Sequence, residues 1–169
     1  MKRILLLVTA FFIFTSGTAI AETGSTLDQI KKTETIRIGY RESEPPMSFL
    51  SEDKQPVGYT IDLCTQIVQA VKGKLKNPNI STKYVPVTAS SRFDALSDNK
   101  IDILCGSTTK TLTRAEKVDF TLLSFVTGAS LISMEGSTID KVADLKGKKV
   151  AVTKDTTTLD NLKKALKKA

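Results

Sequence analysis

The sequence contains no histidine. This absence excludes catalysis by Ser-His or Cys-His pairs, and it excludes any metal site built on imidazole ligands. There are only two cysteines, Cys64 and Cys105, and their separation matches no metal-binding spacing. In an oxidising compartment they could form a disulfide, but two buried thiols fit the sequence equally well. These residues therefore predict no metal site, and we also expect no cofactor and no catalytic residue.

Long apolar runs are absent beyond the first 21 residues. Within that segment a basic start precedes the apolar run Ile4 to Ile13, and Ala19-Ile20-Ala21 forms a small-x-small cleavage sequence. This three-part pattern is typical of a secretory signal peptide, and its apolar run is too short for a good membrane span. The residue directly after the cleavage site is not a cysteine, which argues against a lipoprotein. We predict cleavage after Ala21 and a periplasmic mature protein.

The charge is unbalanced, with 25 Lys and Arg against 18 Asp and Glu, a formal net charge of +7. Much of the excess lies at the end of the chain, in Lys163, Lys164, Lys167 and Lys168. A run of this kind is usually one solvated face, so the charge requires no nucleic-acid partner, and we expect none. An anionic small-molecule ligand is compatible with the charge without being implied by it.

The pattern of apolar residues alternates between strand and helix periods. The predicted strands are 35–40, 80–87, 101–104 and 149–153, with a further extended run over 125–134. The predicted helices are 27–32, 60–75, 92–97, 109–118, 139–145 and 157–168. Such alternation with short connections predicts an α/β fold with a largely parallel sheet. In these sheets ligands lie beyond the carboxyl ends of the strands, at helix N-termini.

Polar residues follow several of the predicted strands. Arg41 follows the first, Ser90 and Arg92 follow the second, and residues 105–109 follow the third, with Arg114 five residues further on. A last group, residues 153–158, separates the final strand from the final helix. Hydroxyls, helix N–H groups and a planar guanidinium suit a carboxylate or a phosphate. Helix capping and ordinary surface arginines explain the same residues, so spacing alone leaves both interpretations open.

Several longer segments resemble the glutamate/aspartate-binding proteins of bacterial ABC uptake systems, within solute-binding protein family 3. The segments that carry the resemblance are 26–43, 57–75, 91–114 and 144–158. The resemblance implies a periplasmic-binding-protein-like type II fold, with two α/β lobes joined by a hinge. Residues 22–125 would form lobe 1, and residues 126–169 would begin an incomplete lobe 2.

The resemblance also implies roles for individual residues. Arg114, with Ser107 and Thr109, would hold the α-carboxylate of an amino acid. Arg41 and Arg92 would face the side-chain carboxylate, which explains a preference for acidic ligands because a neutral side chain would leave both cations unpaired. Two further candidate ligand-binding residues are Ser90 in lobe 1 and Thr157 in lobe 2. The implied partners are an amino acid and the membrane permease subunits of an ABC transporter, and the implied state is a monomer.

Two residues depart from the family pattern. Ala89 stands where a hydroxyl residue is expected, and Asp155 stands where the family usually has glycine. A carboxylate at position 155 could repel an acidic ligand or restrict the backbone. Two other functions remain open: an enzyme on the same fold, such as a cyclohexadienyl dehydratase, and the sensor domain of a receptor kinase. An enzyme of the first kind needs a general acid, and the sequence offers no convincing candidate.

Overall fold

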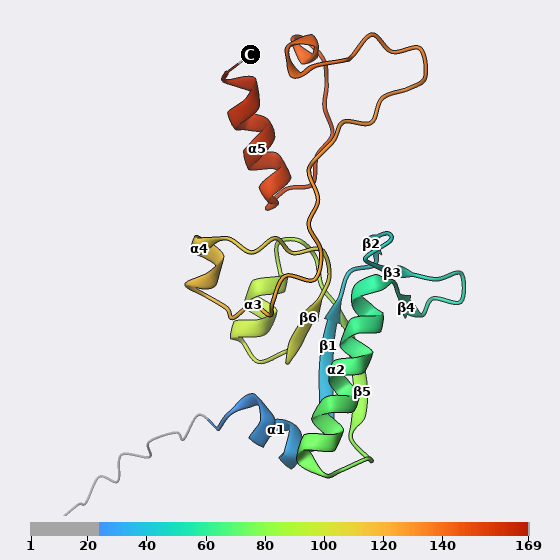
Figure 1. Cartoon of the computed structure of the whole chain (residues 1–169), viewed down its shortest axis with the longest axis vertical. Coiled ribbons are helices and arrows are strands. Elements are labelled where there is room, and N and C mark those ends of the chain that lie inside the picture. The colour runs from blue at the N-terminus through green and yellow to red at the C-terminus, as the bar shows by residue number, and fades with distance from the viewer. Residues whose placement is uncertain (1–23, 169) are drawn as a thin grey trace, which may run out of the picture.

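A three-stranded parallel sheet forms the centre of the first part of the chain. In the computed structural model, which describes residues 24–168, β1 (Thr35–Tyr40) lies between β5 (Ser81–Pro86) and β6 (Ile103–Cys105) (Figure 1). Ile36 and Ile38 alternate along β1 and are both buried, as the period of two predicts. The predicted parallel α/β sheet is confirmed, and the predicted signal peptide lies outside the described residues.

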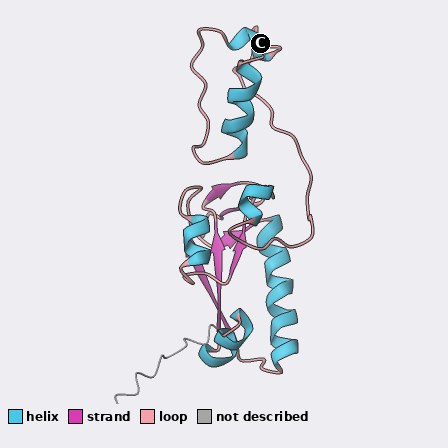
Figure 2. Cartoon of the chain, turned by 90° about the vertical axis from the view of Figure 1, so that its left-hand side faces the viewer, coloured by secondary structure: helices cyan, strands magenta, loops and turns pink. Residues whose placement is uncertain are grey.

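Helices cover both faces of this sheet (Figure 2). On one face, α2 (Tyr59–Leu75) buries Ile61, Cys64 and Val68 in a core that also contains Ile30 of α1 (Thr26–Thr33). On the other face, α3 (Arg92–Ser97) packs in a smaller cluster of Val87, Ala95 and Ile101. The 3.6-residue period of α2 predicts its buried side, because its apolar residues recur at one face of the helix.

A small antiparallel sheet that the sequence did not reveal precedes α2. It consists of β2 (Ser43–Glu44), β3 (Ser48–Leu50) and β4 (Pro56–Val57), in the order β2-β3-β4. Gly58 joins it to α2 with a φ of +124°, where a Cβ would lie 2.6 Å from the carbonyl oxygen of Met47. Only glycine fits this conformation and this contact, so Gly58 fixes how the small sheet meets the helix.

Cys64 of α2 and Cys105 of β6 form a disulfide, with their Cα atoms 6.4 Å apart. The sequence left this pairing open. The bond connects the longest helix to an outer strand of the parallel sheet, directly before the loop that begins with Gly106. It therefore anchors one of the strand ends at which a ligand is expected.

Several predicted elements in the second part of the chain are wrong or shorter than expected. Residues 125–134 and 149–153 form no strand, because no other strand within residues 24–168 pairs with them. The expected helix over 109–118 is reduced to α4 (Leu112–Ala115), since the Thr111 hydroxyl caps it by accepting from the Arg114 N–H. The helix expected over 139–145 is a 3-10 turn, η1 (Val142–Leu145).

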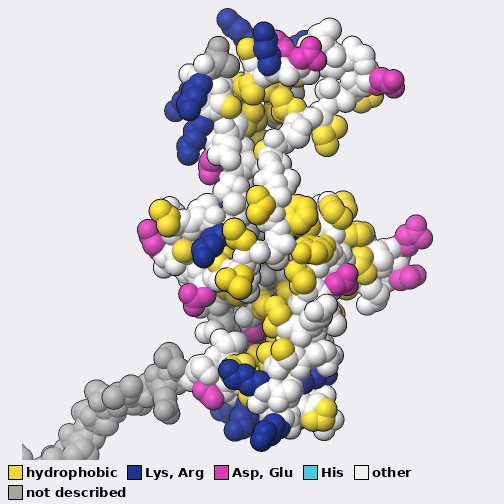
Figure 3. All heavy atoms as spheres, viewed as in Figure 1, with side chains coloured by type: hydrophobic (Ala, Val, Ile, Leu, Met, Phe, Trp, Pro, Cys, Tyr) yellow, Lys and Arg dark blue, Asp and Glu magenta, His cyan; other side chains and the backbone are white. Residues whose placement is uncertain are grey.

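After α4 the chain leaves the sheet, and η1 and α5 (Thr157–Leu166) lie beyond it (Figure 1). The N-terminal end of α5 faces back toward the sheet. Basic side chains gather over α5 at one end of the molecule and around α1 at the other (Figure 3). None of the helices within residues 24–168 has the length and apolar character needed to cross a membrane. The division into lobe 1 at 22–125 and lobe 2 at 126–169 stays a prediction.

Candidate functional site

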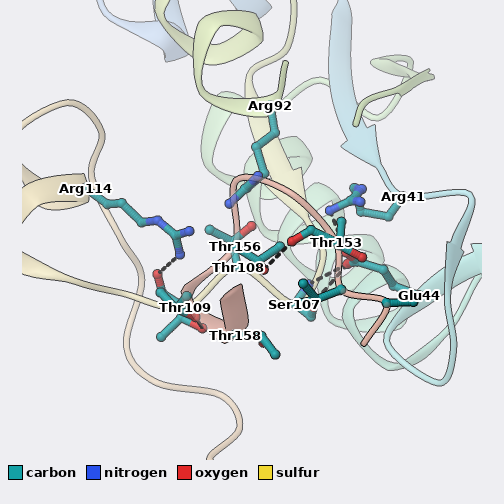
Figure 4. A pocket seen from close by; sticks show the side chains of 13 residues that line it. Arg41, Glu44, Arg92, Ser107, Thr108, Thr109, Arg114, Thr153, Thr156 and Thr158 are labelled. Carbon is teal, nitrogen blue, oxygen red and sulfur yellow. Dashed lines mark hydrogen bonds and ion pairs between the residues drawn. The ribbon is translucent and has the colours of Figure 1, made fainter. Parts of the chain in front are cut away.

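A cavity of about 310 Å³ lies between the ends of the parallel strands and the N-terminus of α5 (Figure 4). Three arginines and one glutamate line it, together with hydroxyl groups from residues 107–109 and 153–158. The arginines come from the loop after β1, from α3 and from α4, so only the folded chain brings their charges together. A cavity rich in guanidinium and hydroxyl donors is suited to an anionic ligand with several oxygen atoms.

Six of the seven predicted ligand-binding residues line this one cavity. They are Arg41, Arg92, Ser107, Thr109, Arg114 and Thr157. Ser90 does not: it is exposed, and its hydroxyl lies 3.3 Å from that of Thr88. The structure thus brings together nearly the whole predicted set, while the contact of each residue with a ligand stays a prediction.

Arg92 is the most unusual residue of the cavity. Arg92 is only 2% exposed, and no group within residues 24–168 accepts a hydrogen bond from its Nε or Nη1. Its Nη2 donates to the Asp155 carbonyl at 3.2 Å, and its guanidinium lies 4.5 Å from the ring centre of Phe93. Burial, together with the positive charges of Arg114 and Arg41, lowers the pKa of Arg92 to about 10. Arg92 thus stays charged at neutral pH without a matching carboxylate.

Arg114 extends from α4 toward the same space. Its Nη1 donates to the Thr109 carbonyl at 2.8 Å, and the Thr109 hydroxyl lies 3.2 Å from that of Thr157. Burial lowers the pKa of Arg114, and Asp160 partly opposes this shift. Thr109 and Thr157 belong to the two parts of the chain, so their contact connects the loop after β6 to the start of α5.

Arg41, Glu44 and Ser107 form a second group within the cavity (Figure 4). Arg41 Nη1 and Glu44 Oε1 are 2.5 Å apart. The Ser107 hydroxyl and backbone N–H both donate to Glu44 Oε2, at 2.7 and 3.4 Å. The backbone of Arg41 is fixed by the fully buried Ser48, whose hydroxyl accepts from the Arg41 N–H at 2.9 Å. Arg41 therefore already has a carboxylate partner, in contrast to Arg92.

The loop before α5 forms the opposite wall. The Thr156 hydroxyl donates to the Thr153 carbonyl at 2.7 Å and accepts from the Leu159 N–H at 3.3 Å, which caps α5. Asp155 has a φ of +59°, a left-handed conformation that aspartate tolerates better than most residues. Its carbonyl bonds Arg92, whereas its exposed side chain is not part of the cavity lining. The expected repulsion of a ligand by direct contact with Asp155 thus has no support in this geometry.

Glu44 is the charged cavity residue that sequence reasoning missed. It lies three residues after Arg41, a spacing that offered a signal because oppositely charged neighbours often pair across a tight turn. The structure holds no His, Cys, Asp and Glu cluster of three or more suited to a metal ion in residues 24–168. Glu44 is the one acidic side chain among the described residues that line the cavity.

Comparison with known proteins gives a consistent result. Residues 36–169 match the family described as bacterial extracellular solute-binding proteins, family 3. The glutamate/aspartate import solute-binding protein of Salmonella typhimurium is 42% identical over 134 residues, which are 79% of this chain and 44% of that protein. The L-glutamate/L-aspartate-binding protein of Pseudomonas aeruginosa is 39% identical over 146 residues, 86% of this chain and 48% of that protein. The chain thus spans about half the length of these relatives.

A solved structure shows the same architecture. An ancestral amino-acid-binding protein, described as a precursor of cyclohexadienyl dehydratase, superposes with a TM-score of 0.76 at 31% identity. The match covers 86% of this chain and 63% of that one. The parallel α/β sheet together with this likeness assigns the chain to the periplasmic-binding-protein-like type II fold. The chain belongs to the bacterial extracellular solute-binding proteins, family 3. The resemblance seen in the sequence is confirmed.

Proposed function

We propose that this protein binds an acidic amino acid, glutamate or aspartate, as the substrate-binding component of an amino-acid ABC uptake transporter. Arg92 carries this proposal. A buried guanidinium with two unbonded nitrogen atoms is costly unless an anion completes it. Because Arg92 lines the cavity, a ligand carboxylate can supply that anion. The glutamate/aspartate-binding relatives named above support the same class of ligand.

The geometry suggests how the charges are divided. Arg114, Ser107 and Thr109 would bind the α-carboxylate, with Thr157 adding a hydroxyl from the second part of the chain. Arg92, and Arg41 where it is released from Glu44, would bind the side-chain carboxylate. Ligand contacts to both parts would favour a closed arrangement of two lobes over an open one, since a ligand shifts such an equilibrium by its differential affinity. Permease subunits would then recognise the closed form.

The compartment and the assembly are part of the proposal. The predicted signal peptide and the Cys64–Cys105 disulfide both favour an oxidising periplasm. The transporter partners would be membrane permease subunits, and the binding protein itself would act as a monomer. No step of this function requires nucleic acid, a metal or a cofactor.

Calorimetry tests the proposed ligand class. The purified chain is titrated with glutamate, aspartate and glutamine under identical conditions, and a form extended to the length of the relatives is titrated in parallel. We expect glutamate and aspartate to bind more tightly than glutamine, because the neutral amide leaves Arg92 without a counterion. Equal or tighter binding of glutamine by both forms would refute acidic specificity.

Arg114→Lys provides a matched test of the α-carboxylate contact. Lysine keeps the charge but loses the planar pair of donors, so we expect affinity for all three amino acids to fall by about 10-fold. The loss should be similar for glutamate and glutamine, because both carry the same α-carboxylate. A loss confined to glutamate would instead assign Arg114 to the side chain of the ligand.

A second function deserves a test because the ancestral relative above is named as a precursor of a cyclohexadienyl dehydratase, and because Glu44 places a carboxyl group in the cavity. Both oxygen atoms of that carboxyl already contact Arg41 and Ser107, so neither is free to face the leaving group of a substrate. We therefore favour binding over catalysis. Turnover of prephenate by the extended form would reverse this preference.

A further inference from the structure

We propose that Glu44 is an internal competitor for acidic ligands, a side chain that holds the position of a ligand carboxylate between Arg41 and Ser107. This inference rests on the proposed function of the cavity and adds a specificity-determining residue to it. Glu44 lines the cavity, and its side chain remains 23% exposed. It is thus placed to enter or to leave the site without unfolding any element.

The donors around Glu44 are those that a bound carboxylate would use. One oxygen atom contacts the guanidinium of Arg41 at 2.5 Å. The other accepts from the hydroxyl of Ser107 at 2.7 Å and from its backbone N–H at 3.4 Å. Guanidinium, hydroxyl and main-chain N–H groups are typical partners of carboxylates. A ligand carboxylate and the Glu44 carboxylate cannot occupy this position together.

The local backbone favours this arrangement. Glu44 pairs with Ser48 in the small antiparallel sheet, and its carbonyl accepts from the Met47 N–H at 2.8 Å, so its main chain is fixed. Gly106 allows the loop after β6 to approach, because a Cβ there would lie 3.1 Å from Arg41 Cγ. The Glu44 side chain can rotate without any change in this main chain. Displacement by a ligand would therefore cost one ion pair and one short hydrogen bond.

The consequence is a change in the charge that a ligand meets. With Glu44 in place, Arg41 is neutralised, and the uncompensated cations of the cavity are Arg92 and Arg114 among the described lining residues. A monocarboxylate amino acid can use Arg114 without disturbing Glu44. A dicarboxylate that engages Arg41 must displace Glu44 and suffers repulsion from it while both are near. Glu44 thus lowers the preference for acidic over neutral amino acids.

A different role would predict the opposite result. Glu44 could accept the ligand's ammonium group, since it is acidic and lines the cavity. Both of its oxygen atoms are already used by Arg41 and Ser107, which favours competition over ammonium binding. Removing Glu44 should therefore strengthen glutamate binding if it competes, and weaken binding of every amino acid if it accepts the ammonium.

The test is an NMR titration of the ¹⁵N-labelled chain, followed at the Ser107 amide, with L-glutamate and L-glutamine as probes. Three variants are compared: Glu44→Ala, Glu44→Gln and the control Glu42→Gln. Glu42 is exposed, lies two residues away and is outside the cavity lining, so it separates direct contact from general charge. Urea unfolding of each variant verifies that it is folded.

We expect Glu44→Ala to bind glutamate about 10-fold more tightly than the unchanged chain, with less than about 3-fold change for glutamine. Glu44→Gln should give a smaller gain, because its amide oxygen still accepts from Ser107, and Glu42→Gln should change neither ligand. Unchanged or weaker glutamate binding by folded Glu44→Ala would overturn the inference alone. Absence of any response to either probe, in the unchanged chain and in Glu44→Ala, would overturn the proposed function as well.

Discussion

Replacing Arg92 with methionine is expected to stabilise the ligand-free protein and to abolish its affinity for acidic amino acids. The two effects have one cause. Arg92 is buried with two unbonded nitrogen atoms, and the charges of Arg114 and Arg41 add repulsion. Its pKa of about 10 lies below that of a free guanidinium, so the folded chain disfavours its charged form. A ligand carboxylate would relieve this unfavourable state, and methionine would remove it permanently.

The magnitudes follow from the same shift. A pKa lowered below the unfolded value means that the cost is fully present at pH values below the folded pKa, and so at pH 7. The shift corresponds to about 3 kcal/mol before solvent screening, which reduces it, so we expect Arg92→Met to raise the free energy of unfolding by about 1–3 kcal/mol. Without the charge, glutamate affinity should fall by at least about 100-fold. Urea unfolding and calorimetry measure the two effects.

Arg37→Met is the matched control. Arg37 has a partner: its Nη2 lies 2.6 Å from Asp102 Oδ1, and its Nε donates to Asp102 Oδ2 at 3.0 Å. This hydrogen bonding raises the pKa of Arg37, the opposite direction to Arg92. Removing Arg37 leaves a carboxylate whose side chain is only 3% exposed, so we expect a loss of about 2–4 kcal/mol. Destabilisation of similar size in both variants would show that Arg92 serves packing rather than ligand binding.

The sequence predicted the parallel sheet for a clear physical reason. Strands such as β1 and helices such as α2 have apolar periods that can be read locally. Once the sheet is parallel, its carboxyl ends meet at one edge, so the polar residues after its strands become candidates for a binding site. That Arg41, Ser107 and Arg114 would contact one ligand was implied by the family resemblance. The structure places these three residues on one cavity.

Other features depend on contacts that no local pattern contains. Residues 149–153 have the composition of a strand, yet a strand also needs a neighbour, and none pairs with them in the described part of the chain. The two- and three-residue strands β2 and β3 are too short to show a period. The contact between Glu44 and Ser107 joins residues 63 positions apart. Ser90 lies outside the cavity lining because a hydroxyl after a strand can bond its own loop, as this one does with Thr88.

Replacing both Cys64 and Cys105 with alanine should lower the free energy of unfolding by about 4 kcal/mol. The disulfide joins residues separated by 41 positions, and a loop of that size restricts the unfolded chain by about this amount. Both residues also lie in the core, with exposed fractions of 5% and 1%. Since a whole domain is typically stable by about 5–15 kcal/mol, this loss would leave the protein marginal.

Urea unfolding with and without dithiothreitol separates the disulfide from the side-chain packing. The unchanged chain should lose stability on reduction and approach the double alanine variant, whereas the variant should be insensitive to the reductant. A reduced chain as stable as the oxidised one would contradict the prediction, because the disulfide would then add no stability beyond that of two packed thiols. A variant much less stable than the reduced chain would assign the loss to the smaller side chains.

Reduction of the disulfide should nonetheless leave the ligand affinity of the molecules that stay folded nearly unchanged. Cys105 lies two residues before Ser107, but its backbone also pairs with Tyr40 in the parallel sheet. Ser107 itself donates a hydrogen bond to Glu44, and the Thr109 carbonyl accepts one from Arg114. These hydrogen bonds hold the loop in place without the disulfide. Affinity for glutamate measured well below the unfolding midpoint should therefore change by less than about 3-fold on reduction. A larger loss would mean that the bond shapes the cavity in the folded state, rather than acting through the unfolded chain.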